Sequence, residues 1–182
     1  MKKIVVNDTN VFIDLFNVGL LEEFFSLPWE IHTTNFVMQE LLREGQVSSV
    51  SQYKDSSRLH IPVFEQKELI EIGQMYQRYY GKRTNVSFTD CSVWYYAKVN
   101  NYMLLTGDRK LRNVSHLDGV EVHGVIFVFD HLVALGIVPQ KTAAEKLKQL
   151  YSLNPRLPKE EIEKRVDSWL SDAAGIDDND SQ

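Results

Sequence analysis

The chain has 182 residues, 43% of them hydrophobic, which is enough for one domain with a substantial core. No apolar run is long enough to span a membrane. The first residues pass from two lysines and three aliphatic side chains directly to Asn7 and Asp8, so no secretory signal is expected. Cys91 is the only cysteine, which excludes an intrachain disulfide and favours a cytoplasmic location.

The net charge of −5, from 20 basic and 25 acidic residues, does not by itself indicate nucleic-acid binding. Eight of the 25 acids form two groups, four in the C-terminal tail and four that are candidates for one site, and removing them leaves 17 acids against 20 bases. A mildly basic rim around an acidic site is one interpretation, and a mixed, solvated surface is the other. The tail acids are Asp172, Asp177, Asp178 and Asp180, and the bases cluster at Arg78, Lys82 and Arg83 and at Arg109, Lys110 and Arg112.

Short apolar runs alternate with helical periodicity along the chain. In order, the pattern predicts a strand at 4–6, helices at 11–16 and 20–27, a strand at 30–34, a helix at 35–44 between Asn35 as N-cap and Gly45 as terminator, a strand at 59–64, helices at 67–80 and 87–99, a strand at 102–105, a short helix at 109–111, a strand at 120–122, and helices at 125–135, 142–150 and 159–170. Residues 46–58 are predicted to be loop or weak helix, residues 81–86 a polar loop, and the last ten residues frayed.

Strands that alternate with helices predict an α/β fold of three layers, with a central, mainly parallel, five-stranded sheet between helices and extra helices at the C-terminus. In such sheets ligands bind at the carboxyl ends of the strands, next to the point where the strand order reverses. The informative residues are therefore the polar ones that follow the strands.

Two acids follow predicted strands directly. Asp8 follows the first strand, and Asp108 follows the strand at 102–105 through Thr106 and Gly107. Each has a local explanation as a helix N-cap, Asp8 for residues 11–16 and Asp108 for residues 109–111. Asn10 is an equally good cap for the first of these helices, so Asp8 is open to either role.

Two further acids lie on helices that leave the same edge. Glu40 falls at the margin of the apolar stripe of its helix, whereas an ordinary surface Glu, paired with Arg43 or a lysine, would lie opposite that stripe. Asp90 completes a capping box with Ser87, yet apolar residues three, four and seven positions later place it at the head of the buried stripe. Both therefore have a structural and a functional interpretation.

Together the four acids predict a metal site. Two bare carboxylates about 5 Å apart repel by roughly 3 kcal/mol at an effective dielectric near 20, so such a cluster needs protonation or a divalent cation. Ligands that are all oxygen suit Mg²⁺ or Mn²⁺ rather than Zn²⁺. Ions of this kind activate water and stabilise charge in phosphodiester hydrolysis.

The segments around these acids resemble a known family. IVVNDTNVFIDL, TTNFVMQELL, VSFTDCSVWYYAK and MLLTGDRKLR are similar, in this order, to the four acidic motifs of the PIN domain. The later stretch VEVHGVIFVFDHLVALGIVPQKTAAEKLKQL resembles the closing strand and helices of bacterial and archaeal PIN proteins. The resemblance extends from about Lys3 to Leu150. It implies a PIN-like nuclease domain at 1–150, followed at 151–182 by a helical extension with an acidic tail that is packed on, or appended to, the same domain.

The resemblance implies an Mg²⁺- or Mn²⁺-dependent endoribonuclease, often the toxin of a toxin–antitoxin pair like VapC. Carried over by position, the acidic quartet is Asp8, Glu40, Asp90 and Asp108, with Asn10 and Thr106 in the supporting polar positions. The implied partners are RNA, a small antitoxin protein and a second copy of the chain. The extension is longer than in the usual small toxin and is open to interpretation as a lid, a dimer element or a partner-binding arm. Phosphate contacts are expected from the basic rim, namely Lys82, Arg83, Arg109 and Lys110.

Other functions fit the sequence less well. A haloacid-dehalogenase-like phosphatase needs an acid two residues after its nucleophilic Asp, where this chain has Asn10. A catalytically inactive PIN-like module that binds RNA or protein is the main alternative, although the complete quartet argues against it. A cysteine hydrolase at Cys91 lacks a clearly placed histidine, and the five histidines lack zinc-type spacing.

Overall fold

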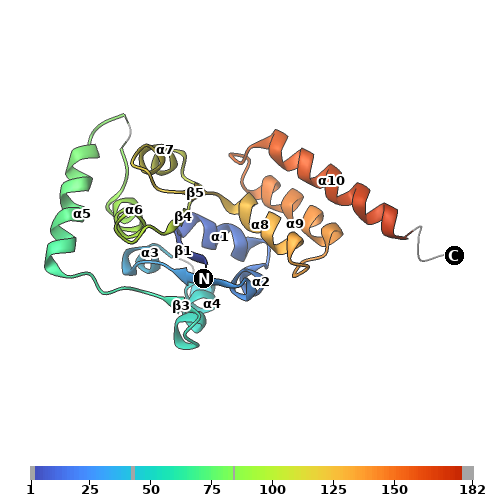
Figure 1. Cartoon of the computed structure of the whole chain (residues 1–182), viewed down its shortest axis with the longest axis horizontal. Coiled ribbons are helices and arrows are strands. Elements are labelled where there is room, and N and C mark those ends of the chain that lie inside the picture. The colour runs from blue at the N-terminus through green and yellow to red at the C-terminus, as the bar shows by residue number, and fades with distance from the viewer. Residues whose placement is uncertain (1–2, 42–43, 84, 178–182) are drawn as a thin grey trace.

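The computed structural model describes residues 3–41, 44–83 and 85–177, and its five strands form one parallel sheet in the order β3-β2-β1-β4-β5 (Figure 1). The chain moves outward from β1 to β2 and β3, then returns to the other side of β1 for β4 and β5. The strand order therefore reverses between β1 and β4, and Val6 of β1 lies between His32 of β2 and Leu104 of β4. The strands are β1 Lys3–Asn7, β2 Trp29–His32, β3 Leu59–His60, β4 Met103–Leu105 and β5 Val122–His123.

Helices cover both faces of this sheet. Because parallel crossovers are right-handed, the helices before β2 and β3 lie on one face and those before β4 and β5 on the other. Contacts agree, since α1 packs with α2, α4 and α8, whereas α6 packs on β1 and β4 and against α5 and α7. The predicted three-layer fold with a five-stranded parallel sheet is confirmed. The helices up to this point are α1 Thr9–Asn17, α2 Leu21–Ser26, α3 Asn35–Glu40, α4 Glu44–Asp55, α5 Gln66–Tyr79, α6 Phe88–Asn100, α7 Arg109–Leu117 and α8 Val125–Ala134.

The segment after β2 differs from its prediction. The helix predicted at 35–44 is α3, which ends at Glu40, and its N-cap is Thr34, whose hydroxyl accepts a bond from the Val37 N–H. Gly45 lies inside α4 instead of ending a helix. Residues 46–58, predicted as loop or weak helix, contain most of α4, which has only a weak apolar stripe. Its buried Tyr53 stacks on Phe25 of α2 at 3.7 Å between ring centroids, so tertiary packing selects the helix from the two predicted alternatives.

Two other predicted lengths were wrong. The strand predicted at 59–64 is only Leu59–His60, because it is an edge strand that meets Pro62, which cannot donate a ladder hydrogen bond. The helix predicted at 109–111 extends to Leu117 as α7. Its buried Leu111, Val114 and Ser115 recur at helical spacing within an otherwise polar sequence.

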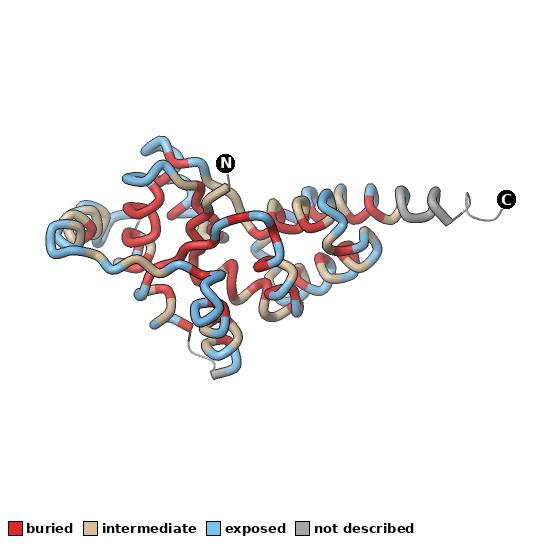
Figure 2. The backbone as a smooth tube through the Cα atoms, turned by 60° about the horizontal axis from the view of Figure 1, so that its bottom comes forward, coloured by how far each residue is buried: buried red, intermediate tan, exposed pale blue. Residues whose placement is uncertain are grey.

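The C-terminal helices form an antiparallel pair, α9 Gln140–Leu153 and α10 Lys159–Asp177, beside α8 (Figure 1). Buried residues recur along one side of α10, at Ile162, Val166 and Trp169 (Figure 2). The last ten residues were predicted to be frayed, but α10 continues to Asp177, and residues 178–182 lie outside the described part of the chain, as does Arg43. No helix within the described ranges is both long and apolar enough to cross a membrane.

We propose that this extension belongs to the same folding unit. Val166 is 4% exposed, so Val166→Asp would bury an unpaired carboxylate. We expect it to lower the free energy of unfolding by about 3 kcal/mol in urea denaturation. The exposed neighbour Lys164, replaced by Asp, is the matched control and should change stability by less than about 0.5 kcal/mol. Equal stability of the two variants would show that α10 contributes no packing energy to the domain.

Candidate active site

The site lies at the carboxyl edge of the sheet, where β1 and β4 are neighbours and the strand order reverses. Asp8 is the first residue after β1, and its N–H donates to the Leu105 carbonyl of β4 at 3.0 Å. Its side chain is nearly fully buried, with 2% exposed. Asp8 therefore occupies the position at which doubly wound sheets bind their ligands.

Hydrogen bonds hold both oxygens of the Asp8 carboxylate. Oδ1 accepts from the Thr9 N–H at 2.7 Å, which makes Asp8 the N-cap of α1. Oδ2 accepts from Asn10 Nδ2 and from the Thr106 hydroxyl, each at 2.7 Å. The cap and the site are therefore compatible, because the cap uses one oxygen and the other faces residues from both strand ends.

Thr106 and Asn10 connect the two loops that carry Asp8 and Asp108. The Thr106 hydroxyl also accepts from the Asp108 N–H at 3.0 Å, and the Gly107 N–H donates to Asn10 Oδ1 at 2.6 Å. A Cβ at position 107 would lie 3.0 Å from that Asn10 oxygen, so glycine permits this close approach. The two residues predicted to support the quartet thus lie between its members.

Asp108 is the N-cap of α7, as its local pattern indicated. Its Oδ1 accepts from the N–H groups of Lys110 at 2.7 Å and Leu111 at 2.8 Å. Within the described residues its Oδ2 accepts no hydrogen bond. One oxygen is thus used for capping and the other is available to a ligand.

Asp90 and Glu40 show the same division. Asp90 forms the capping box of α6, with Oδ2 accepting from the Ser87 N–H at 2.6 Å, while Glu40 Oε2 accepts from the Thr9 hydroxyl at 2.8 Å. The second oxygen of each carboxylate has no protein partner in the parts of the chain that are described. Glu40 is the last residue of α3, and its bond to Thr9 brings it next to the start of α1.

The four carboxylates influence one another electrostatically. Burial, and next the negative charge of Asp90, raise the pKa of Asp8 to about 7, with a smaller contribution from Glu40, although hydrogen bonds from Thr106 and Thr9 oppose the rise. Burial also raises the pKa of Asp90, and the charges of Asp108 and Glu40 add to it against the Ser87 bonds. The sheet edge therefore concentrates negative charge that is only partly compensated by hydrogen bonds.

The acids do not form a closed cage. Among the described residues no three His, Cys, Asp or Glu side chains converge closely enough to hold one ion. Mg²⁺ does not require such a cage, because it commonly keeps several waters and binds through one or two carboxylates together with substrate phosphates. The donor set, with one free oxygen each on Glu40, Asp90 and Asp108, suits an oxygen-seeking divalent ion.

The predicted basic rim is only partly near these acids. Arg109 follows Asp108 and lines an adjacent cavity, while Lys110 is exposed on α7. Lys82 and Arg83 are exposed in the loop before α6, and in the described part of the chain neither forms an ion pair with one of the four acids.

Two neighbours of the quartet were not predicted as site residues, although Arg112 was named among the clustered bases. Thr9 holds Glu40, and Arg112 donates through Nη2 to the Thr106 carbonyl at 3.0 Å. The signal for Arg112 was its position four residues, about one helical turn, after Asp108, the N-cap of α7. No local signal joined Thr9 to Glu40, which is 31 residues away.

The fold and this edge define an α/β protein with a carboxylate-lined site at the reversal of strand order. Residues 4–170 match the family described as the PIN domain, and the chain belongs to that family, whose members are generally nucleases. No curated protein sequence matches the chain significantly.

Solved structures are similar at low sequence identity. PAE2754 from Pyrobaculum aerophilum is 16% identical with a TM-score of 0.51, over 74% of this chain and 99% of that one. The structure of VapBC2 from Rickettsia felis bound to a promoter DNA fragment is 19% identical with a TM-score of 0.49, over 66% of this chain and 98% of that one. FitAcB from Neisseria gonorrhoeae is 15% identical with a TM-score of 0.39, over 65% and 95%. At these identities the similarity concerns the fold alone. Of these three structures, only PAE2754 is similar enough to support the fold assignment.

Proposed function

We propose that the chain is a divalent-metal-dependent endoribonuclease that hydrolyses RNA phosphodiester bonds. The observation that carries this proposal is the carboxylate cluster at the sheet edge, where Thr9 bonds to both Asp8 and Glu40, and Thr106 bonds to both Asp8 and Asp108. Such a cluster is stabilised by a cation, and membership of the PIN domain family supports nuclease chemistry.

The proposed ions are one or two Mg²⁺ or Mn²⁺, bound at the acidic edge by Asp8, Asp90 and Asp108 together with waters and substrate phosphates, so that no single ion needs all three carboxylates. When bound at such a site, the ion supplies a Lewis acid that activates water and neutralises charge on the phosphoryl oxygens. Asn10 and Thr106 hold Asp8 Oδ2 in a fixed orientation through bonds of 2.7 Å. Because these bonds already fix the carboxylate, ion binding does not have to restrict its orientation.

Glu40 is proposed as a fourth ligand or as the acceptor that orients the attacking water. The Thr9 hydroxyl donates to Glu40 Oε2 at 2.8 Å. This bond also fixes the orientation of the free Oε1. Substrate phosphates are proposed to contact the basic rim of Lys82, Arg83, Arg109 and Lys110. These contacts would make RNA binding weaken as the salt concentration rises.

The test is cleavage of single-stranded RNA by the purified chain. We expect cleavage with Mg²⁺ or Mn²⁺ and none in EDTA, followed by recovery when the metal is restored, as measured on denaturing gels. Cleavage that persists in EDTA would contradict the proposal. Binding of RNA without cleavage under any metal would favour the inactive PIN-like module instead.

The proposed partners are a small antitoxin protein and a second copy of the chain, both from the family resemblance. An antitoxin would support a role as the toxin of a toxin–antitoxin pair. Copurification with the product of a small adjacent reading frame tests the first partner. Light scattering of the purified chain tests the second.

A further inference from the structure

We propose that a cavity beside the acidic site binds one nucleotide of the single-stranded RNA substrate, with Arg112 and Arg156 contacting its phosphate. This inference rests on the proposed ribonuclease function. The cavity has a volume of about 460 Å³ and lies between α7, the start of α8 and the segment that leads into α10. Its lining includes Gly107 and Arg109, the two residues that flank Asp108, so it lies next to the acidic site.

The charges that line the cavity leave a positive excess. Four arginines and two carboxylates contribute to its wall. Both carboxylates are bound to Arg165, whose Nε and Nη2 donate to Asp130 at 2.7 and 2.9 Å and whose Nη1 lies 3.5 Å from Glu161. Arg109, Arg112 and Arg156 have no carboxylate partner within the described chain. Three unpaired guanidinium groups at one cavity favour a phosphate ligand, which they match geometrically.

The absence of a side chain at position 124 leaves room for the guanidinium of Arg112. A Cβ on Gly124 would lie 2.5 Å from Arg112 Nη2. The backbone of Gly124 has φ −112°, which any residue adopts, so the glycine serves the close approach of Arg112 rather than a special backbone conformation. The same guanidinium donates to the Thr106 carbonyl, and the Thr106 hydroxyl donates to Asp8, so the arginine is linked to the acidic site through one residue.

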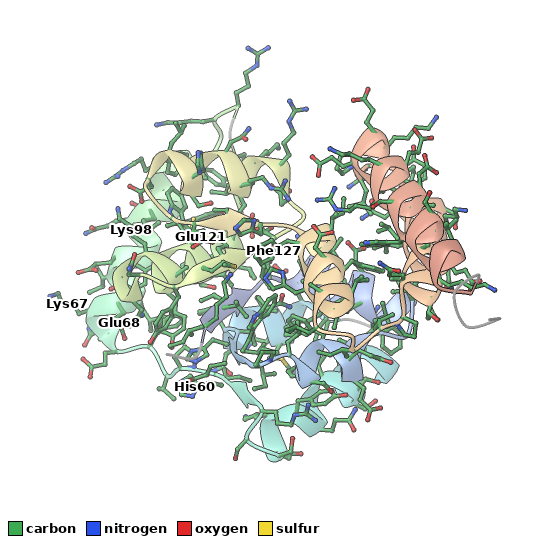
Figure 3. The ribbon with its side chains drawn as sticks, turned by 45° about the vertical axis from the view of Figure 1, so that its right-hand side comes forward. His60, Lys67, Glu68, Lys98, Glu121 and Phe127 are labelled. Carbon is green, nitrogen blue, oxygen red and sulfur yellow. The ribbon has the colours of Figure 1, made fainter. Side chains whose placement is uncertain are left out.

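The cavity is also lined by an aromatic pair and by backbone dipoles. The rings of His123 and Phe127 stack with 3.9 Å between centroids and an interplanar angle of 16°, and both line the cavity. The side chain of His123 is 33% exposed, so a base can stack beside it. The first turn of α8 also faces the cavity and favours a negative group there. Figure 3 labels Glu121, just before β5, and Phe127, in the first turn of α8.

These features favour a nucleotide over an acidic peptide. A nucleotide would use both features of the cavity, its phosphate binding the arginines that lack a carboxylate partner in the described chain and its base stacking on the aromatic surface. An acidic peptide would use only the arginines. A base that stacks on a protein ring must be unpaired, which is typical of single-stranded RNA. Arg156 and Arg165 both come from the extension after Leu150, so the extension would complete the substrate site.

The test measures binding in EDTA, separately from cleavage. A fluorescent single-stranded RNA of about ten nucleotides is titrated with the full chain, and anisotropy is recorded over a series of salt concentrations. We expect Arg112→Gln/Arg156→Gln to weaken binding roughly tenfold, because two charge-assisted phosphate contacts are lost. The slope of log K against log salt should fall in magnitude by about 0.7, the value for one neutralised phosphate of a single strand.

The matched control removes two positive charges elsewhere. Lys148→Gln/Lys164→Gln changes exposed residues of α9 and α10 outside the cavity and should leave affinity within about twofold. Circular dichroism verifies that both double variants fold. Equal binding by the two double variants would overturn the cavity assignment, even if metal-dependent cleavage is observed. Capture of an acidic peptide but not of RNA by the cavity arginines would also overturn it.

Discussion

Asp8→Asn is expected to reduce metal-dependent RNA cleavage by about a thousandfold, equivalent to about 4 kcal/mol in the activation free energy. The substitution keeps the side-chain volume, and the amide oxygen can still accept from the Thr9 N–H. It removes the charge that would bind the ion, and it places an NH₂ group against the two donors that now bond Oδ2, Asn10 and Thr106. Initial rates with saturating Mn²⁺ measure the effect.

The same assay separates site carboxylates from other carboxylates. Asp90→Asn should reduce the rate by a similar factor, because Asp90 is a proposed ligand of the ion and its second carboxylate oxygen is free of protein partners among the described residues. Asp118→Asn is the control, since Asp118 makes an ion pair with Lys98 at 2.7 Å on the surface and should leave the rate unchanged. Wild-type rates in both site variants would exclude the acidic edge as the catalytic centre.

The metal-free chain is expected to lose about 3 kcal/mol of stability between pH 5 and pH 8 because of Asp8. The pKa of this carboxyl is about 7 in the folded chain, against an ordinary value of 3.8, so folding favours the protonated form. Its stabilising effect is complete below pH 3.8 and is lost as the pH rises to about 7. Urea denaturation in EDTA at the two pH values measures this change.

Two variants show whether this effect belongs to a metal site. Asp8→Asn should gain about 3 kcal/mol relative to wild type from pH 5 to pH 8, although the altered hydrogen bonds lower its stability by about 1 kcal/mol at both values. Asp14 is a matched control, because burial also raises its pKa, to about 6, and its hydrogen-bond partner is Asn154 rather than a residue of the acidic edge. Mn²⁺ at pH 8 should stabilise wild type and Asp14→Asn, but not Asp8→Asn.

An opposite result has a clear meaning. If wild type and Asp8→Asn respond equally to pH, the Asp8 carboxyl is not the group that titrates. If Mn²⁺ stabilises Asp8→Asn as much as wild type, the ion binds elsewhere. Either result would favour capping of α1 as the main role of Asp8.

Much of the fold was predictable from the sequence because its signals are local. The apolar runs at 4–6 and 102–105 and the caps at Ser87 and Asp108 depend on residues within a few positions of one another. Such patterns predicted the order of strands and helices and the parallel sheet. They left loop and weak helix open at α4, where the helix depends on Tyr53 packing on Phe25, and they failed at the end of β3, where the edge position decides the length.

For this protein, the sequence by itself determined which acids follow the strands and which of them cap a helix, because those bonds join near neighbours. Only the tertiary structure decided that Thr9 holds Glu40, that Thr106 holds Asp8 across 98 positions, and that Arg112 and Arg156 line one cavity. These contacts depend on how right-handed crossovers place β4 beside β1, and on how α9 and α10 fold back beside α8, which no local pattern specifies.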